Sequence, residues 1–239
     1  MRAITVNEYG AAPALTEMPD PRPGSGQLLI RTEAAGMNPM DRTIANGGWK
    51  AQMPASFPLI LGADLAGVIE AVGEGAGRFL PGDEVFGQLL IVPLGTAGTY
   101  AEYVAVTEDA PLARLPKGLE PSIAAALPTA GVTALEIVES VEPLTSKTVL
   151  MVGAAGGVGS FATQLAANAG AQVIAVAPAG PTTVCVTTAQ PRRSTARRPR
   201  CWTPCSGRTR TASMSSSTWR ATPTTSPPSR HSFVPAARR

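Results

Sequence analysis

The sequence predicts an α/β protein made of a small β-barrel, the beginning of a parallel α/β sheet, and a terminal segment without a core. Three observations lead to this prediction. Residues 1–120 contain short strands separated by Gly and Pro, residues 121–178 combine helical periods with a strand–turn–helix–strand unit, and residues 179–239 lack Leu, Ile, Asp and Glu. Short β-rich runs between turn residues indicate strands, and strands that alternate with helices indicate a parallel sheet.

The barrel region, residues 1–120, contains strands with few helical periods between them. Its clearest strands lie at residues 3–6, 27–32 and 65–72. Gly- and Pro-containing turn signals stand between them, at residues 21–24, 73–75 and 81–83. Such regular punctuation is typical of a small antiparallel barrel.

Helical periodicity begins at Pro121 and covers residues 123–127 and 134–139. A short, wholly apolar strand follows at residues 148–152, of the kind that is buried on both faces of a parallel sheet. A Gly-rich turn, an Ala-rich helix closed by Gly170 and a second apolar strand complete the unit. This order is the context that a dinucleotide-binding fingerprint requires.

The Gly-rich turn is the candidate cofactor site. Gly156 would let the backbone approach a pyrophosphate, the helix N-terminus offers free N–H groups to that anion, and Gly159 would allow close helix–strand packing. The first Gly of the fingerprint is replaced by Ala154, so a merely tight βα turn is the alternative. The candidate cofactor-binding residues of the turn are Ala154, Ala155, Gly156, Gly157, Val158 and Gly159.

The second strand ends in Val176, Ala177 and Pro178, with no acidic residue to bind the ribose hydroxyls of NAD. This favours NADP(H) over NAD(H). Residues that would bind the 2′-phosphate fall in the terminal segment and cannot be identified there.

The terminal segment, residues 179–239, differs in composition from everything before it. It holds 11 Arg and no Lys, and Arg, Pro, Ser and Thr make up 40 of its 61 residues. All 17 acidic residues lie in residues 1–178 together with nine Lys and Arg, which gives that part a net charge of −8. A segment with so little to bury cannot offset its ordering entropy, so residues 179–239 are predicted to be disordered.

Two origins account for this segment: a natural basic arm, or a shifted reading frame in a GC-rich gene. When the codons of residues 210–229 are read one base earlier, every Ser becomes Leu, Ile, Val or Phe and every Thr becomes Asp, Asn, His or Tyr. One allowed reading contains a Val-Val-Ile strand between acidic residues, followed by a Gly turn. The frameshift is favoured because it restores a globular pattern, and it implies a sheet cut to its first two strands.

Several classes of protein are excluded or disfavoured. No run approaches the roughly 20 apolar residues of a membrane span, and the first residues read as a strand instead of a signal peptide, so a cytoplasmic protein is expected. Residues 1–178 contain neither Cys nor His, because Cys185, Cys201, Cys205 and His231 all lie in the terminal segment. The folded part therefore offers no disulfide framework, no Cys- or His-based zinc site and no Cys or His catalyst.

Residues 1 to about 177 resemble the zinc-independent medium-chain dehydrogenases/reductases, specifically the quinone oxidoreductase (zeta-crystallin-like) branch. The ordered motifs that carry the resemblance are residues 34–41, 61–67, 81–87, 127–134 and 153–159. The resemblance implies a GroES-like catalytic barrel over residues 1–120 and the start of a Rossmann domain over residues 121–178. It also implies NADPH-dependent reduction of quinones, enones or related carbonyls without zinc, and a homodimer only where the Rossmann domain is complete.

The resemblance also implies roles for single residues. Asn38 stands where the zinc-containing branch has a Cys ligand, so polarising a substrate carbonyl falls to a donor such as its carboxamide; an Asx turn before Pro39 is the alternative. Asp41 is expected to be a structural partner in preference to an acid catalyst. Trp49 lines the pocket or packs at the surface, and Thr133 contacts the cofactor or satisfies backbone groups at a helix start.

Three other functions compete with this one. A frameshifted remnant without activity is the main alternative. A nucleic-acid-binding protein acting through the Arg-rich segment is disfavoured, because that segment has neither the aromatic interleaving of RNA-binding modules nor heptads. A zinc alcohol dehydrogenase is disfavoured because every ligand is missing.

Overall fold

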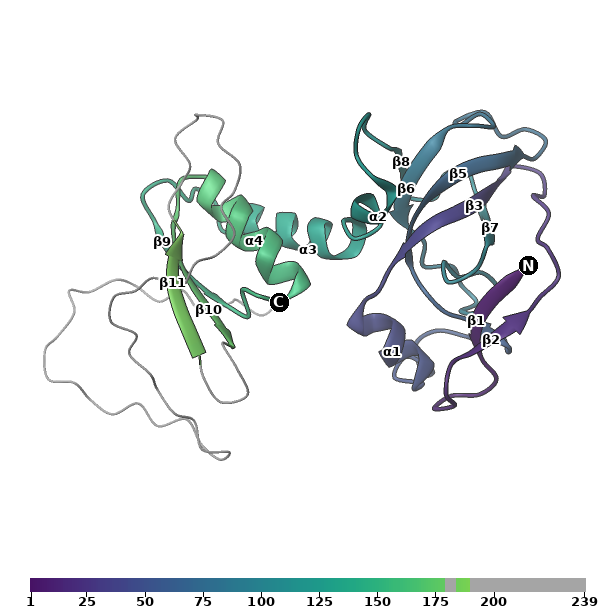
Figure 1. The fold of residues 1–239 in the computed structure, drawn as a ribbon, viewed down its shortest axis with the longest axis horizontal. Helices are drawn as coiled ribbons and strands as arrows, with labels where there is room; N and C mark the ends of the chain where they lie inside the picture. The colour runs from purple at the N-terminus through teal and green to yellow at the C-terminus, as the bar shows by residue number, and fades with distance from the viewer. Residues whose placement is uncertain (179–183, 190–239) are drawn as a thin grey trace, which may run out of the picture.

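The structure, a computed structural model, describes residues 1–178 and 184–189. Figure 1 shows two bodies: a β-rich body that contains β1 to β8 and α1, and a smaller body that contains α2 to α4 and β9 to β11, in which α2 and α3 lie on the side that faces the first body. The α/β fold predicted from the sequence is confirmed. The disorder predicted for residues 179–183 and 190–239 concerns residues outside the described ranges.

The centre of the first body is a five-stranded antiparallel sheet in the order β7-β3-β5-β6-β8. Side chains on one face of each strand meet in a single core, which includes Leu28, Ile30 and Leu65, because successive residues of a strand point to opposite faces. Phe79, from the segment between β5 and β6, also belongs to this core. The strands are β3 (Gln27–Gly36), β5 (Asp64–Val72), β6 (Glu84–Gln88), β7 (Tyr103–Thr107) and β8 (Leu112–Arg114).

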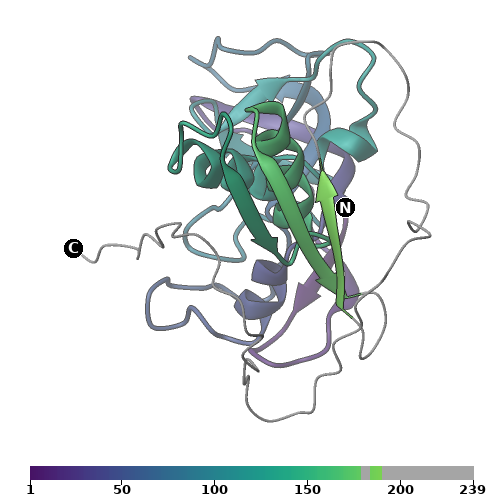
Figure 2. The same cartoon turned by 90° about the vertical axis from the view of Figure 1, so that its left-hand side faces the viewer.

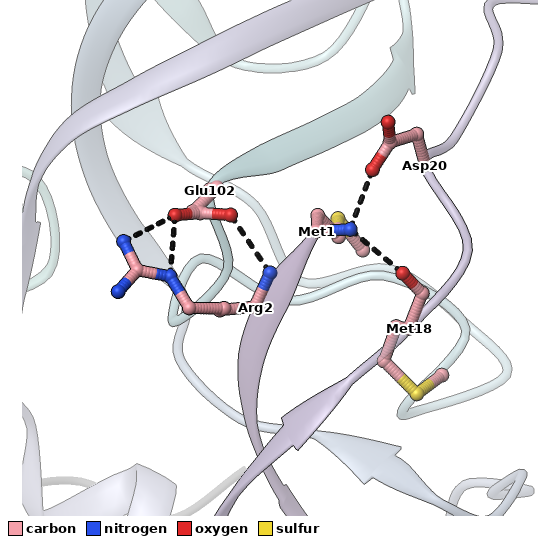
Figure 3. A network of polar contacts seen from close by, with 5 residues as sticks. All are labelled: Met1, Arg2, Met18, Asp20 and Glu102. Atoms are coloured by element: carbon pink, nitrogen blue, oxygen red, sulfur yellow. Dashed lines mark hydrogen bonds and ion pairs between the residues drawn. The ribbon is translucent and has the colours of Figure 1, made fainter.

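A smaller antiparallel sheet joins β2 (Ala14–Glu17), β1 (Arg2–Val6) and β4 (Leu59–Ile60). Figure 3 shows how its first strand is held: the Arg2 guanidinium lies 2.5 Å from the Glu102 carboxylate, and the Met1 ammonium donates to the Met18 carbonyl at 2.7 Å. The ammonium also lies 2.5 Å from the Asp20 carboxylate. Exposed ion pairs add little stability, so buried apolar packing beneath β1 is the main attachment of this sheet.

Helix α1 (Pro39–Ala45) follows β3 directly. Pro39 occupies its first position, where a missing backbone N–H costs nothing. The helix buries Ile44 and Ala45 against Val6 and Leu59, which belong to the smaller sheet. Helix α1 therefore fixes the position of the residue that precedes it, Asn38.

The second body begins with α2 (Pro121–Ala124) and α3 (Pro128–Glu139), and the predicted domain boundary near residue 120 lies in the segment between β8 and α2. Strand β9 (Thr148–Val152), helix α4 (Gly157–Asn168) and strand β10 (Gln172–Pro178) follow, with β9 and β10 parallel. Helices α3 and α4 pack against each other and against one face of this sheet through small residues such as Ala134, Ala162 and Ala166. In Figure 2 the sheet faces the viewer and the helices lie behind it.

The prediction that residues 148–152 are buried on both faces is wrong. Leu150 is 63 % exposed and Val152 is 74 % exposed, while Val149 and Met151 between them pack against the helices. A parallel strand is buried on both faces only where helices cover both sides of the sheet. In the described part of the chain, α3 and α4 cover one side.

A third strand, β11 (Val184–Ala189), pairs antiparallel with β10. The sequence predicts disorder for residues 179–239 and a sheet of two strands, so the structure differs at these six residues. The segment holds Val and Thr without Arg or Pro, a composition that suits a strand. The strand is antiparallel because five residues separate it from β10, whereas a parallel crossover needs a dozen or more.

Within the residues that the structure describes, no helix combines the length and apolar character needed to cross a bilayer.

Candidate functional site

The densest buried polar network lies where β3, α1, β5 and the start of α3 meet. At its centre is Asp64, the first residue of β5, which is 1 % exposed. Its carboxylate accepts three hydrogen bonds: from Asn38 Nδ2 at 3.0 Å, from the Thr129 backbone N–H at 3.0 Å and from Thr129 Oγ1 at 2.7 Å. A buried carboxylate is tolerated only with such partners, so these contacts define the local structure.

Asn38 joins helix α1 to this network. Its backbone is extended, as expected before proline, and its backbone N–H donates to Asp41 Oδ2 at 2.7 Å. Its side chain reaches Asp64 across the sheet. Because a carboxylate only accepts hydrogen bonds, the amide nitrogen of Asn38 is the atom that faces Asp64. Asn38 therefore begins the helix through its backbone and serves the network through its side chain.

Asp41 is also buried, and its Oδ2 accepts a second hydrogen bond from the Tyr100 hydroxyl at 2.7 Å. Burial raises the pKa of Asp41 above its usual value, the bonds from Asn38 and Tyr100 offset part of that rise, and the charge of Asp64 adds to it. The pKa of Tyr100 is raised, first by burial and then by Asp41. The Oδ1 atom of Asp41 has no hydrogen-bond partner among the described residues. Asp41 also lines a cavity of about 20 Å³, which is room for one water.

The two bodies touch tightly beside this network. A Cβ built on Gly36, two residues before Asn38, would lie 2.3 Å from the backbone oxygen of Ala125. Gly36 is therefore required by the close approach of β3 to the chain between α2 and α3. Gln88 of β6 adds a further link, since its Nε2 donates to Thr129 Oγ1 at 2.7 Å.

The Gly-rich turn forms the N-terminus of α4. Gly156 is the residue before the helix, with φ −76° and ψ 169°, and both Gly156 and Gly157 are exposed. A Cβ on Gly156 would meet only the Gly153 carbonyl oxygen, at 3.3 Å, whereas a Cβ on Gly159 would lie 2.2 Å from that same oxygen. Gly159 is thus required by the fold of the turn itself, and Gly156 leaves the backbone open to an incoming group.

The remaining predicted residues lie in separate places. The Trp49 side chain packs with the apolar cluster around Val6 and Ile44. Thr133 is exposed on α3 and donates to the Thr129 carbonyl at 2.7 Å. In the turn, the Ala154 N–H donates to the Val176 carbonyl, Ala155 is exposed, and Val158 packs against the helical core. The structure therefore brings Asn38 and Asp41 into one network and the turn residues into another group.

The sequence analysis missed four members of the polar network: Asp64, Gln88, Tyr100 and Thr129. Asp64 and Thr129 lie within two of the ordered motifs, residues 61–67 and 127–134, and could have been found there as polar residues in apolar surroundings. Gln88 and Tyr100 carry no comparable signal, because only the folding of the barrel brings them to the site. No group of three or more His, Cys, Asp or Glu side chains placed to hold a metal occurs in the described residues.

Comparisons with known proteins agree with this architecture. The family model of the alcohol dehydrogenase GroES-like domain matches residues 24–117. A chloroplast envelope quinone oxidoreductase homolog of Arabidopsis thaliana is 37 % identical over 184 residues, which cover 73 % of this chain and 55 % of the relative. The chain thus spans about half the length of the curated relatives it matches.

Solved structures lead to the same family. The quinone oxidoreductase of Coxiella burnetii matches with a TM-score of 0.63 and 33 % identity, over 73 % of this chain and 56 % of that one. A mycobacterial protein solved in complex with NADPH matches with a TM-score of 0.63 and 32 % identity, over 75 % of this chain and 53 % of that one. Sequence motifs, barrel, Gly-rich turn and relatives agree, and the chain therefore belongs to the medium-chain dehydrogenase/reductase family, in its quinone oxidoreductase branch.

Proposed function

We propose that this site belongs to an NAD(P)H-dependent reductase of quinones, enones or related carbonyls that works without zinc, and that Asn38 is its substrate-polarising donor. One observation carries the proposal: the Asn38 carboxamide is held in a fixed orientation by a buried carboxylate at the junction of the two bodies. The quinone oxidoreductases among its relatives support the substrate class.

The chemistry asked of Asn38 is electrostatic. Reduction of a quinone or carbonyl places negative charge on the substrate oxygen, and a fixed N–H donor stabilises that charge without reorganisation. Asn38 Nδ2 carries two hydrogens, and one hydrogen bond is recorded for it, to Asp64. The second hydrogen would donate to the substrate oxygen.

A nicotinamide cofactor, when bound, supplies the hydride. The turn fits such a cofactor, since Gly156 and Gly157 expose backbone at the N-terminus of a 12-residue helix, where N–H groups lack intrahelical acceptors. Thr133, on the adjacent α3, is proposed as a further contact. NADP(H) is favoured over NAD(H), because no acidic residue ends the second strand and because one similar structure contains NADPH.

The donor chemistry of the folded part supports zinc independence. Zinc sites in proteins are built mainly from Cys and His, and residues 1–178 have neither. Asp41 and Asp64, the two buried carboxylates, are already engaged by N–H and O–H donors. Metal analysis of the purified chain should find less than stoichiometric zinc; stoichiometric zinc lost in Asp64→Asn would contradict the proposal.

The test of Asn38 is kinetic. In a protein whose reading frame has been restored beyond codon 178, Asn38→Ala should lower kcat by about 10²–10³-fold, the usual cost of removing one such donor, while the Kd for NADPH stays within about twofold. Asn7→Ala, at an exposed position after β1, is the matched control. An unchanged kcat for quinone reduction in Asn38→Ala would leave Asn38 with its helix-starting role alone.

An inactive remnant is the second candidate, and it is favoured by the face of β9 that the described part of the chain leaves exposed. Leu150 and Val152 stand exposed where an α/β sheet is normally covered, and the chain spans about half of its relatives. We expect the 239-residue chain to oxidise NADPH with a small quinone far more slowly than the frame-restored protein. Comparable turnover of the two proteins would refute this second reading.

A further inference from the structure

We infer that Asp64 is a positioning residue. It fixes the orientation of the Asn38 carboxamide, and it makes that orientation depend on the position of helix α3 against β5. The inference rests on the proposed role of Asn38, and its physical part, the coupling between Asp64, Thr129 and Asn38, can be tested without any catalytic assay.

The hydrogen bonds around Asp64 have a defined direction. Gln88 Nε2 donates to Thr129 Oγ1 at 2.7 Å, so the hydroxyl oxygen is occupied as an acceptor. The hydroxyl hydrogen then points to Asp64 Oδ1 at 2.7 Å. The Thr129 backbone N–H and Asn38 Nδ2 donate to Oδ2, so three donors converge on one carboxylate and Gln88 supports one of them. If donor and acceptor exchanged roles in any one of these hydrogen bonds, a buried polar group would be left without a partner.

Two of these three donors come from the other body. Thr129 is the second residue of α3, where backbone N–H groups have no intrahelical acceptor, so Asp64 supplies that acceptor across the junction. If α3 moved away, Asp64 would lose both bonds from Thr129. The buried carboxylate would then have to draw its hydrogen bonds from Asn38 or from water, and the amide would lose its single orientation.

The same helix also lies against the candidate cofactor turn. A Cβ built on Gly157 would lie 3.6 Å from the Cβ of Ala130, the residue after Thr129. Helices α3 and α4 lie against each other, so the start of α3 stands between the turn and Asp64, and Asp64 accepts a hydrogen bond from Asn38. A cofactor bound at the turn would hold α3 in place. Through Asp64, it would thereby fix the orientation of the Asn38 amide that donates to the substrate.

Asparagine side chains give a direct test, because the chain contains four: Asn7, Asn38, Asn46 and Asn168. Selective ¹⁵N labelling of Asn carboxamides in the 239-residue protein yields four NH₂ pairs, and Asn38→Ala identifies one of them. In Asp64→Asn, where the bond from Asn38 loses its charged acceptor, we expect the Asn38 pair to shift and its protons to exchange with solvent about tenfold faster or more. In Thr129→Val, where Asp64 loses the bond from the Thr129 hydroxyl and keeps the bond from Asn38, we expect the Asn38 pair to shift because the carboxylate is held by one donor fewer.

Matched variants separate positioning from general damage. Thr129→Ser keeps the hydroxyl and should leave the Asn38 pair close to its original position. Thr145→Val removes an exposed hydroxyl in the loop between α3 and β9 and should change nothing at Asn38. Gly36→Ala would place a Cβ 2.3 Å from the Ala125 oxygen and 3.0 Å from Asp64 Cβ, so it should shift the Asn38 pair while every hydrogen-bonding group of the network is retained. If Asp64→Asn fails to fold, the resonance positions of the Asn38 pair in Thr129→Val and in Thr129→Ser test the inference, because only Thr129→Val should shift them.

An Asn38 pair that is unmoved in Thr129→Val, or that moves no more than the other three pairs, would overturn the inference. Kinetics then distinguish it from the proposed function. In the frame-restored enzyme, Asp64→Asn should lower kcat with little change in the KM for NADPH, and should add little further loss to Asn38→Ala. If the Asn38 pair shifts in Thr129→Val while Asn38→Ala leaves kcat unchanged, the coupling is supported and the catalytic role of Asn38 is refuted. If the kcat losses of Asp64→Asn and Asn38→Ala add in the double variant, Asp64 does not act through Asn38.

Discussion

The two bodies of this protein are built from similar strands, yet they differ in how completely they cover their apolar surface. In the barrel, alternate residues of β3, β5 and β6 meet in one closed core, and Leu28, Leu65 and Val85 are fully buried. In the second body, β9 alternates in the same way, but the described residues cover only one of its faces. A strand sequence therefore specifies which residues share a face, and the presence of covering elements decides whether that face is buried.

The difference has consequences for stability. Small residues of α3 and α4 and a single sheet face supply the core of the second body, whereas the barrel buries Leu, Ile and Val side chains of its five strands and Phe79 of the segment between β5 and β6. Since the stabilisation from apolar burial scales with the area removed from water, the barrel should be the more stable body. The following predictions test that comparison.

The largest contrast is expected between two leucines. Leu65→Ala in the barrel core should lower the free energy of unfolding by about 2–5 kcal/mol, because it leaves a cavity in a close-packed region. Leu150→Ala, at a residue that is 63 % exposed, should cost less than about 1 kcal/mol. Urea unfolding of both variants measures the two values, and equal losses would mean that the outer face of β9 is covered in solution.

A second contrast lies within the Gly-rich turn. Gly159→Ala places a Cβ 2.2 Å from the Gly153 carbonyl oxygen and should destabilise the second body by about 1–3 kcal/mol, the usual cost of overpacking, while the barrel stays folded. Gly156→Val meets no such contact and should leave both bodies folded but abolish NADPH binding, since its side chain blocks the approach to the backbone. Thermal unfolding and fluorescence titration with NADPH separate the effects; retained affinity in Gly156→Val would refute the pyrophosphate assignment.

The smallest expected effect is the pH dependence of the stability that Asp41 contributes. Burial raises the pKa of Asp41 above its ordinary value of 3.8, so the folded protein holds this proton more tightly than the unfolded chain. The stability that this group contributes is fully present below about pH 3.8 and is lost as the pH rises through its raised pKa. The stability of the wild type relative to Asp41→Asn should therefore fall as the pH rises from that value.

Glu108 provides the opposite control in the barrel. The backbone N–H groups of Arg78 and Gly77 lower its pKa below 4.5, so its contribution is present above that pH and is lost as the pH falls through its lowered value. The stability of the wild type relative to Glu108→Gln should therefore rise with pH. Chemical unfolding at a series of pH values gives both slopes, and slopes of the same sign would show that Asp41 is not held in a buried environment.

Much of the fold could be predicted because it follows from local rules. Periodicity and turn residues located the barrel strands, the helices of residues 121–178 and the strand–turn–helix–strand unit, and the ordered motifs identified the family. The turn could be recognised because its glycines are consecutive in sequence. The short strand β11 was missed because six residues of Val, Thr, Cys and Ala were averaged into an Arg-rich segment of 61.

The polar network could be predicted only in part. Sequence alone determined that Asn38 stands before a Pro-initiated helix, that no Cys or His is available in residues 1–178, and that a Gly-rich turn starts α4. Tertiary structure decided that Asp64, Thr129, Gln88 and Tyr100 join Asn38 and Asp41, because residues from five separate segments become neighbours only after the β-rich body folds and α3 docks on it. It also decided that β9 is covered on one face, since burial depends on which other elements pack there and not on the strand itself.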